Sequence, residues 1–415
     1  MRKIWLVNPY GPIEGENWRE YSFNQFGKHL SQNGFEVIWW TANFSHHFKK
    51  YRSESWRDVR VNDNFIIRLV PTNSYKKNIG FGRFRKDFMF GTNALKRFKT
   101  EDKPNLIIAA ENPMCMGRPA FEYASKNDVP IIYDQMDIWP EFLIKVLPKP
   151  ISIIANMAME PVYLKRKRIY NKIEGAIALG KHYLEFMFEI SPSLRTKPNA
   201  LIYNGIDVQE FRRHLSDPIN CSGIPKKKDG EIWCIFAGTL GPSYDIQCIV
   251  DCATKFEKEG SEKFKFIIAG SGPLEKIVRK AEEDNHNLIY VGKLLPNELI
   301  PIYGMCDIGL QTYSAGSNVD MCDKFYDYTA AGLAVVNSLT GEVAEHIAGQ
   351  HVGFNYKAGH LDDFSEKLIE LSKNDNLTNA KKASAALAKN FDMHVQNERL
   401  LCVVNHILDK KGEIE

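Results

Sequence analysis

The stretch DKFYDYTAAGLAVVNS, residues 323–338, begins with charged residues and continues with small and apolar ones. Two alanines followed by Gly332 predict a short helix that packs closely on a sheet and ends at the glycine. The apolar residues after Gly332 predict a buried strand of a parallel sheet. Charged groups at the start of a helix beside such a sheet occupy the place where open α/β proteins bind anionic ligands.

Two charged side chains of this stretch could contact a nucleotide. Asp327, one turn into the predicted helix, could accept hydrogen bonds from both hydroxyls of a ribose, and Lys324 could reach a diphosphate. A second interpretation stays open, because Asp320, Lys324 and Asp327 also have the i, i+4 and i, i+3 spacing of an exposed ion-pair cluster. Such a cluster would contribute little to stability.

Glycine-rich turns follow three of the predicted strands. They are NPYGPIEGE at 8–16, AGTLGPSYD at 237–245 and AGSGPLE at 269–275. Turns of this kind let backbone N–H groups approach phosphate or sugar oxygens at the start of the next helix. None has the GxGxxG or GxxxxGK[ST] pattern, so each taken singly is also compatible with an ordinary tight turn.

Strand-like segments alternate with helical patterns along the whole chain, which predicts an α/β protein with parallel sheets. We expect strands at 4–8, 37–41, 65–70, 106–110, 131–134, 176–179 and 200–203, and then at 233–238, 264–270, 288–292, 308–313 and 333–337. The segment 204–231 is polar, contains glycine and lacks apolar periodicity, so it predicts a domain boundary. We expect one domain at 1–205, a second at 206–385, and a C-terminal helix at 386–415 that packs back on the first.

The two halves of the chain carry opposite net charge. Residues 1–200 contain 31 Lys and Arg against 20 Asp and Glu, a net charge of +11, whereas residues 201–415 contain 23 against 31, a net charge of −8. This asymmetry predicts two domains with different partners.

The N-terminal sequence MRKIWLVNPYG leads directly into a strand and a glycine loop, unlike a signal peptide, and no apolar run reaches the roughly 18 residues of a membrane span. The eight cysteines form no CxxC pair, and Cys248 and Cys252 share one face of a predicted helix. We therefore expect reduced thiols in a cytoplasmic protein. A D-x-D motif and zinc-ligand spacing are both missing, so we expect no metal and no cofactor.

Several segments resemble one family in the order that the family has them. They are IYNGIDVQEF (202–211), FAGTLGPSYD, FIIAGSGPLE, LIYVGKLLPNELIPIYGMCDIGLQTY (288–313) and DKFYDYTAAGLAVV. The family is glycosyltransferase family 4, whose members use nucleotide sugars, have the GT-B architecture and include many bacterial polysaccharide and lipopolysaccharide enzymes. The resemblance is strong over about 200–350 and weaker over 1–200, where NPYGPIEGENWR and YDQMDIWPE fit more loosely.

The chain departs from the family pattern at charged positions. The first of the family's two acids, eight positions before Asp327, falls at Val319, so either Asp320 substitutes for it or its role is absent. The family's Arg and Lys in the first loop of the second domain correspond roughly to Thr239 and Tyr244. Neutralisation of a diphosphate would therefore depend on Lys324 and backbone donors. Met136 stands near the family's frequent histidine, which leaves Asp137 as the nearest polar group.

The resemblance implies two Rossmann-like, doubly wound domains facing a cleft, with a nucleotide sugar in the second domain and a lipid-linked or glycan acceptor in the first. It also implies transfer with retained configuration and without a metal. The candidate catalytic residues are Lys324, Asp137 and Asp320, with an N-cap as the alternative role of Asp137. The candidate donor-binding residues are Gly238, Thr239, Tyr244, Gly270, Gly272, Gly292, Lys293, Asp323 and Asp327. The candidate acceptor-binding residues are Gly11, Gly15, Glu16, Trp18, Arg19 and Trp139.

Two basic segments of the first half interleave cations with apolar residues. Residues 76–99 contain eight Lys and Arg and five phenylalanines, and residues 151–172 change from apolar to strongly basic. This pattern is typical of contact with anionic lipid headgroups, so we expect peripheral binding to the inner face of the plasma membrane. A solvated basic face that covers core phenylalanines is the alternative. We expect no nucleic-acid partner, because no recognised module accompanies the pattern.

Two other functions stay open on the sequence. A nucleotide-sugar 2-epimerase could use the same architecture without an acceptor. A glycosyltransferase-like subunit could also bind sugar or lipid without turnover, which would be consistent with the missing acid at Val319.

Overall fold

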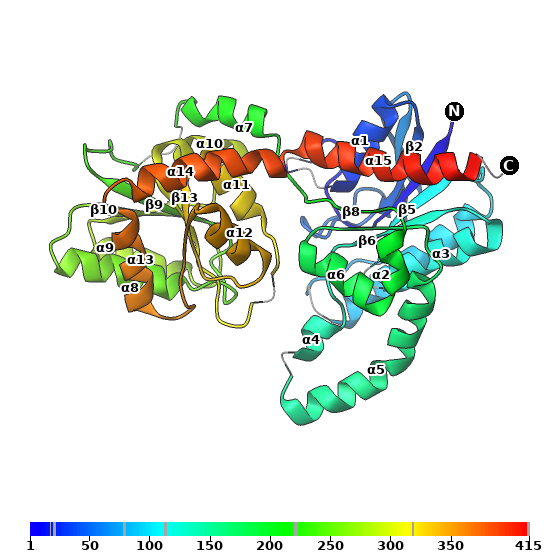
Figure 1. Ribbon diagram of the computed structural model, residues 1–415, viewed down its shortest axis with the longest axis horizontal. Helices are drawn as coiled ribbons and strands as arrows, with labels where there is room; N and C mark the ends of the chain where they lie inside the picture. The colour runs from blue at the N-terminus through cyan, green and yellow to red at the C-terminus, as the bar shows by residue number, and fades with distance from the viewer. Residues whose placement is uncertain are drawn as a thin grey trace. The chain divides into compact units, whose positions relative to one another are not determined.

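The structure is a computed structural model that describes residues 1–16, 18–19, 22–77, 80–111, 114–145, 147–219, 223–317 and 319–412. The chain divides into two compact units, which Figure 1 shows with the chain coloured from blue to red. Unit 1 comprises Met1–Asn204 and Gln396–Glu415, and unit 2 comprises Gly205–Val395.

Unit 1 contains an eight-stranded sheet in the order β3-β4-β2-β1-β5-β6-β7-β8. Its strands are β1 Lys3–Val7, β2 Glu36–Ala42, β3 Arg57–Asn62, β4 Phe65–Val70, β5 Leu106–Ala110, β6 Ile131–Gln135, β7 Gly175–Ala178 and β8 Asn199–Leu201. Its helices are α1 Ser22–Gln32, α2 Phe81–Phe98, α3 Met114–Asn127, α4 Glu141–Lys145, α5 Lys149–Tyr170, α6 Lys181–Ile190, the short η1 Pro192–Thr196, and most of α15 Met393–Gly412. All the strand pairs are parallel except β3 with β4.

Helices cover both faces of this sheet because both faces of its central strands are apolar. Side chains such as Trp5 and Trp40 face a core that α2, α3, α5 and α6 complete. Their neighbours Leu6 and Trp39 point the other way, into a core with α1 and α15. Continuous apolar strands of this kind are typical of parallel sheets that are buried on both faces.

Unit 2 contains a six-stranded, wholly parallel sheet in the order β11-β10-β9-β12-β13-β14. Its strands are β9 Ile232–Ala237, β10 Phe264–Ala269, β11 Leu288–Gly292, β12 Ile308–Gln311, β13 Ala334–Asn337 and β14 Gly353–Asn355. Its helices are α7 Val208–Arg213, η2 His214–Ser216, α8 Ile246–Lys258, α9 Glu275–Asp284, α10 Pro296–Met305, α11 Asp323–Ala331, α12 Glu342–Gln350, α13 Leu361–Leu371, α14 Asn376–Leu387 and η3 Ala388–Phe391. The predicted α/β class with two parallel sheets is confirmed.

Two strands were not predicted, for different reasons. β3, with the sequence RDVRVN, is largely exposed and pairs antiparallel with β4 at the edge of its sheet, so it lacks the apolar run of a buried strand. β14 is a three-residue edge strand, GFN, which is too short to show a pattern. Residues 386–395, which the sequence joined to the C-terminal helix, lie in unit 2.

The thiols of Cys248 and Cys252 are free and buried in the core of unit 2. Among the described residues, no helix combines the length and the apolar character needed to cross a membrane.

Candidate functional site

In unit 2 the strand order reverses direction between β9 and β12. The chain runs from β9 outward to β10 and β11, and then returns to place β12 on the other side of β9. Gly238 follows β9 directly, and Tyr313 lies two residues after β12. Ligands of open α/β sheets bind outside the carboxyl ends of the strands at such a reversal, so this edge is the candidate donor site.

Helix α11 is held against both of these strands by Tyr328. The Tyr328 side chain is fully buried, and its hydroxyl donates to the carbonyls of Ile235 at 3.3 Å and Leu310 at 3.2 Å. A β-carbon at Gly309 of β12 would lie 2.4 Å from the Tyr328 ring, so only glycine leaves room for it. The helix ends at Gly332 in the left-handed conformation, as predicted from the sequence.

Lys324 projects from the first turn of α11 into a group of aromatic rings. Its Nζ lies 3.9 Å from the centre of the Tyr244 ring, 5.2 Å from that of Tyr313 and 5.3 Å from that of Phe236. Only 9% of the residue is exposed. The rings fix the ammonium beside the turn that follows β9 without neutralising its charge, which leaves it able to attract an anion.

Three glycines line the carboxyl edge across β9, β10 and β11. The N–H of Gly238 donates to Ala269 at 2.9 Å, and the N–H of Gly270 donates to Gly292 at 2.7 Å. A β-carbon at Gly270 would lie 1.8 Å from the Gly238 carbonyl oxygen, and one at Gly272 would lie 2.4 Å from that of Leu240. These glycines therefore allow neighbouring turns to approach each other closely. Because glycine has no side chain, the backbone along this edge, which we call the glycine edge, is not covered by side chains at these positions.

Asp320 has a structural partner that the sequence did not indicate. Its carboxylate accepts the backbone N–H of Glu342 at 3.0 Å, and its carbonyl accepts that of Val343 at 3.3 Å. The buried carboxylate thus satisfies the start of α12. A catalytic role for Asp320 would have to be additional to this one and stays a prediction.

The other candidate donor residues lie around the same edge. Asp323 is the first residue of α11, and Asp327 lies one turn later, both partly exposed. Thr239 and Lys293 are exposed in the turns that follow β9 and β11. The structure therefore brings all of them to one end of the sheet of unit 2, and their contact with a ligand stays a prediction.

In unit 1, hydrogen bonds from Arg52 hold the loop that follows β1. Arg52 donates to the two carboxylate oxygens of Glu16 at 2.9 and 2.8 Å, and to the Gly11 carbonyl at 2.7 Å. Gly11 and Gly15 both have positive φ, at 108° and 83°. Glu16, predicted to bind the acceptor, therefore holds the loop in shape. The ring of Trp18 lies against that of His47, with a distance of 3.7 Å between their centres and a tilt of 35° between their planes, and Arg19 beside it is partly exposed.

Asp137 and Trp139 form one turn at the end of β6. The Asp137 carboxylate accepts the backbone N–H of Ile138 at 2.9 Å and the indole N–H of Trp139 at 2.6 Å. Burial raises the pKa of Asp137, although these two hydrogen bonds oppose the shift. The carboxylate thus organises the turn itself, and its proposed contact with an acceptor stays a prediction.

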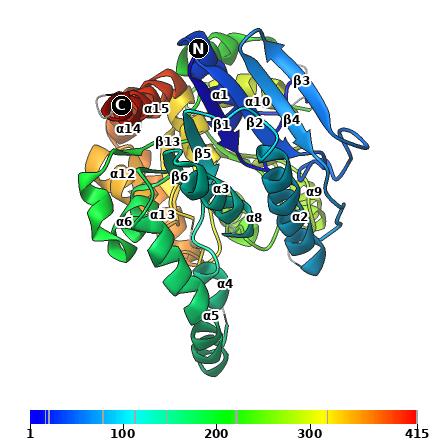
Figure 2. The ribbon, with the colours of Figure 1, turned by 90° about the vertical axis from the view of Figure 1, so that its right-hand side faces the viewer.

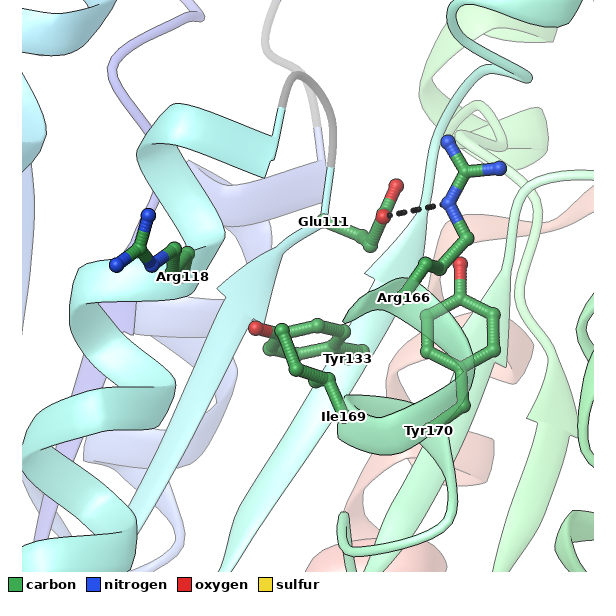
Figure 3. A pocket seen from close by; sticks show the side chains of 6 residues that line it. All are labelled: Glu111, Arg118, Tyr133, Arg166, Ile169 and Tyr170. Atoms are coloured by element: carbon green, nitrogen blue, oxygen red, sulfur yellow. Dashed lines mark hydrogen bonds and ion pairs between the residues drawn. The ribbon is translucent and has the colours of Figure 1, made fainter. Parts of the chain in front are cut away.

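Arg166, which is almost fully buried, connects the same turn to the C-terminal end of α5. Its guanidinium donates to Glu111 at 3.3 Å, to Glu141 at 2.5 Å and to the Trp139 carbonyl. Figure 3 shows Glu111 and Arg166 pointing toward each other in the recess that they line with Arg118, Tyr133, Ile169 and Tyr170. The Arg166 contacts join the ends of β5 and β6 to α5, and so fix the Trp139 turn.

Several residues near the two sites lie in segments that the sequence singled out, but they were not among the candidate site residues. Phe236 and Tyr313 of unit 2, and Tyr10 and Arg83 of unit 1, look like core or surface residues of their elements until the fold brings them together. The recurrence of an aromatic residue at a strand end beside a glycine turn could have identified Tyr313. Within the described parts of the chain, no three His, Cys, Asp or Glu side chains are grouped where they could hold a metal ion.

Comparison with known proteins finds one family model that matches part of unit 2. Residues 231–374 match the family model of glycosyl transferases group 1. The matched segment contains the glycine edge, Lys324 and Asp327. No curated protein matches the chain by sequence.

Solved structures match over the full chain at low sequence identity. Sucrose-phosphate synthase from Thermosynechococcus elongatus matches with a TM-score of 0.69 and 12% identity, covering 99% of this chain and 100% of the other. HepE from Anabaena in complex with UDP and glucose gives 0.63 and 12%, covering 98% and 100%. WaaG, a glycosyltransferase involved in lipopolysaccharide biosynthesis, gives 0.60 and 12%, covering 96% and 98%. The fold is that of GT-B glycosyltransferases.

Proposed function

We propose that the protein is a glycosyltransferase that moves a sugar from a nucleotide-diphosphate sugar to a lipid-linked or glycan acceptor in cell-surface polysaccharide biosynthesis. Unit 2 would hold the donor and unit 1 the acceptor. The observation that carries this proposal is the position of Lys324. Its ammonium lies among aromatic rings beside Gly238, in the segment that matches glycosyl transferases group 1. The transferred group would be a hexose or an N-acetylhexosamine.

The proposed chemistry is transfer with retained configuration and without a metal. As the bond between sugar and diphosphate breaks, negative charge grows on the leaving oxygen, and Lys324 with the backbone donors of the glycine edge would stabilise it. Asp327 would bind the ribose hydroxyls. The acceptor oxygen forms the new bond to the sugar and loses its proton, which Asp137 could accept or orient.

The structural neighbours are consistent with this choice of substrates. HepE was solved with UDP and glucose, and WaaG is involved in lipopolysaccharide biosynthesis. For this chain we infer only the substrate classes, a nucleotide sugar as donor and a glycan or lipid-linked molecule as acceptor.

We also propose that unit 1 binds peripherally to the anionic, cytoplasmic face of the plasma membrane, where a lipid-linked acceptor would lie. Figures 1 and 2 show α5 extending away from the rest of unit 1. The first half of this helix exposes apolar side chains, among them Ile154, which is 68% exposed, and Met157, which is 73% exposed. Its second half borders a groove of about 520 Å³ lined by the cations Arg118, Lys165, Arg168 and Lys172 and by one carboxylate, Glu122, which pairs with Arg118. Apolar side chains beside cations are suited to an anionic bilayer surface.

The other basic segment, 76–99, divides between two roles. Phe90 and Phe98 of α2 belong to the core, whereas Phe81, Phe84 and Phe88 are exposed. Lys86 is fully buried, so it is not available to a lipid headgroup as the sequence suggested. The membrane contact of this segment would therefore depend on the exposed rings and on the exposed cations, without Lys86; the exposed cations are Lys76, Lys77, Arg85, Lys96, Arg97 and Lys99.

A screen of nucleotide sugars by thermal shift, followed by a transfer assay with lipid-linked and glycan acceptors, tests the proposal. A bound donor should raise the melting temperature, because it stabilises the folded state alone. Transfer of the sugar to an acceptor is the expected result. Conversion of the donor without any acceptor would indicate an epimerase instead, and donor binding without turnover of any kind would indicate a binding subunit.

A further inference from the structure

Most of helix α5 has no packing partner within unit 1. Of its 22 residues, the buried ones are Arg166, Ile169 and Tyr170, all close to its C-terminal end. The other residues of α5, all of which the structure describes, are at least partly exposed. Helices in proteins owe most of their stability to the packing of an apolar face. A helix that instead leaves apolar side chains in water is therefore expected to meet a partner.

One face of α5 changes from apolar to basic along the helix. Ile154, Met157 and Pro161 recur at spacings of three and four residues, and Lys165 and Arg168 continue the same series. Residues at this spacing lie above one another on one face of a helix. At the rise of an α-helix, the face from Ile154 to Arg168 is about 21 Å long, with its apolar part first. A ligand that fits this face has an apolar part beside an anionic part.

The basic part of this face lines the groove between α3 and α5, which we call the α5 groove. Its volume is about 520 Å³, within the range of about 300–1,000 Å³ that is usual for sites of small ligands. Phe121 of α3 and Leu164 and Ile169 of α5 give it apolar walls. The groove therefore combines an apolar surface with cations, as the face of α5 does.

Positive charge prevails in the α5 groove. Its described lining includes four cations, Arg118, Lys165, Arg168 and Lys172, and one carboxylate, Glu122, which lies 2.5 Å from Arg118. Burial and the charge of Arg118 lower the pKa of Lys165, although Glu122 opposes the shift. The groove should therefore attract an anion, and a guanidinium such as that of Arg168 can form paired hydrogen bonds with phosphate oxygens.

A second groove, of about 630 Å³, shares Phe121 and Lys172 with the α5 groove. Its charges are mixed, because Asp128 and Glu174 also line it. Lys411 donates to the Asp128 carboxylate at 3.0 Å, so part of its positive charge is neutralised within unit 1. The anionic group of a ligand is therefore expected in the α5 groove rather than in this one.

We propose that the α5 groove binds one anionic phospholipid as a ligand, with the phosphate against Lys165, Arg168 and Lys172 and the acyl chains along the apolar face of α5 toward Ile154. Such a site differs from adsorption to a charged surface because it saturates with one lipid per protein. An acidic peptide or a nucleic acid would complement the cations but would leave Ile154 and Met157 without an apolar partner. The inference rests on the proposed contact of α5 with an anionic membrane and not on the transfer reaction.

Calorimetry of the full-length protein with water-soluble, short-chain lipids tests the site. The probe is dihexanoyl phosphatidic acid below its micelle concentration. The comparisons are dihexanoyl phosphatidylcholine, which has no net charge, glycerol phosphate, which has no acyl chain, and polyglutamate, which is an acidic polymer. The variants are Lys165→Gln and Arg168→Gln. Their matched controls are Lys167→Gln, on another face of α5, and Arg57→Gln, on β3, both at exposed positions.

The short-chain phosphatidic acid should bind to one saturable site. Loss of one charged contact should weaken this binding by about tenfold in Lys165→Gln and Arg168→Gln but not in the controls. Phosphatidylcholine and glycerol phosphate should each bind at least about tenfold more weakly, because each lacks one half of the match. Melting temperatures check the fold of each variant, and Arg168→Gln, at an exposed position, serves as the test if Lys165→Gln fails to fold.

Equal binding by each variant and its control, binding that does not saturate, or equal binding of any comparison probe would overturn the inference. Nucleotide-sugar binding and transfer are measured in parallel. If the lipid binds with the expected pattern and no nucleotide sugar is bound or turned over, the proposed transfer fails and the lipid site stands. If sugar is transferred but the lipid pattern is missing, only the lipid site fails.

Discussion

Lys324 fills the space that a side chain at Gly238 would need. A β-carbon at Gly238 would lie 2.8 Å from Lys324 Cε and 2.9 Å from its Nζ, and the glycine has a φ of 155°. The sequence separates these residues by nearly half of the length of unit 2, yet each restricts what the other position can hold.

Gly238→Ala should therefore displace the Lys324 side chain and strain the turn, at a cost of about 1–3 kcal/mol in unfolding free energy. Transfer activity should fall as well, because the ammonium leaves the glycine edge. Urea unfolding and kcat/KM measure the two effects. Gly241→Ala is the control, since its β-carbon would meet only Thr239 Cγ2 at 3.5 Å. Similar behaviour of the two variants would contradict the placement of Lys324.

Lys324→Ala should lower kcat about 10²–10³-fold, because the lost charge acts mainly on the transition state. Affinity for the nucleotide sugar should change less, since the leaving diphosphate becomes more negative only as the bond breaks. Steady-state kinetics with calorimetry separate the two. Lys258→Ala, at an exposed position at the end of α8, is the control. Unchanged turnover would mean that another group neutralises the diphosphate.

Asp327→Ala should weaken donor binding by about 2–4 kcal/mol through the loss of two charge-assisted hydrogen bonds to the ribose. A ribose clamp holds ground state and transition state alike, so KM should rise more than kcat falls. Calorimetry with the nucleoside diphosphate measures the effect. An unchanged affinity would be incompatible with the clamp.

Replacing Ile154 and Met157 of α5 together by serine should reduce sedimentation with anionic vesicles by at least about tenfold, because both side chains would leave water for the bilayer. The melting temperature should stay the same, since both residues are exposed in the folded protein. Ile369→Ser, at an exposed position in unit 2, is the control. Added salt should weaken binding through the cations of the α5 groove. Vesicle binding that ignores the double substitution would exclude α5 as the contact.

Asp134→Asn should remove a pH dependence of stability. Asp134 is buried on β6, and burial raises its pKa to about 8. The folded state therefore holds this proton more tightly than the unfolded state. Its contribution to stability is complete below the ordinary pKa and is lost as the pH rises toward 8, by up to about 1.4 kcal/mol per pH unit.

Urea unfolding of Asp134→Asn should be measured at several pH values between the ordinary pKa of aspartate and pH 8. The free energy of unfolding should depend less on pH in this variant than in the parent. Asp63→Asn, whose side chain is fully exposed, is the comparison and should keep the profile of the parent. A parent whose unfolding free energy does not fall over this range would show that the buried carboxyl is not protonated.

The sequence by itself determined most of the strands, the two-sheet architecture and the glycine turns. It could do so because these features are local: apolar runs predict buried strands, and an alanine-rich segment with a final glycine predicts α11 and its end at Gly332. β3 was not predicted because an exposed edge strand has no apolar run, and β14 was not predicted because it is too short.

Only the tertiary structure decided what the charged residues do. Lys324 and Asp320 lie four positions apart. Lys324 projects among two tyrosines and a phenylalanine beside Gly238, whereas Asp320 accepts a backbone N–H at the start of α12. Lys86 and Arg85 are neighbours on one helix, but Lys86 is buried against Asp87 while Arg85 is exposed. The reason is physical. Burial and hydrogen-bond partners come from elements distant in the chain, and they determine whether a charge is available to a ligand or is used to hold the fold.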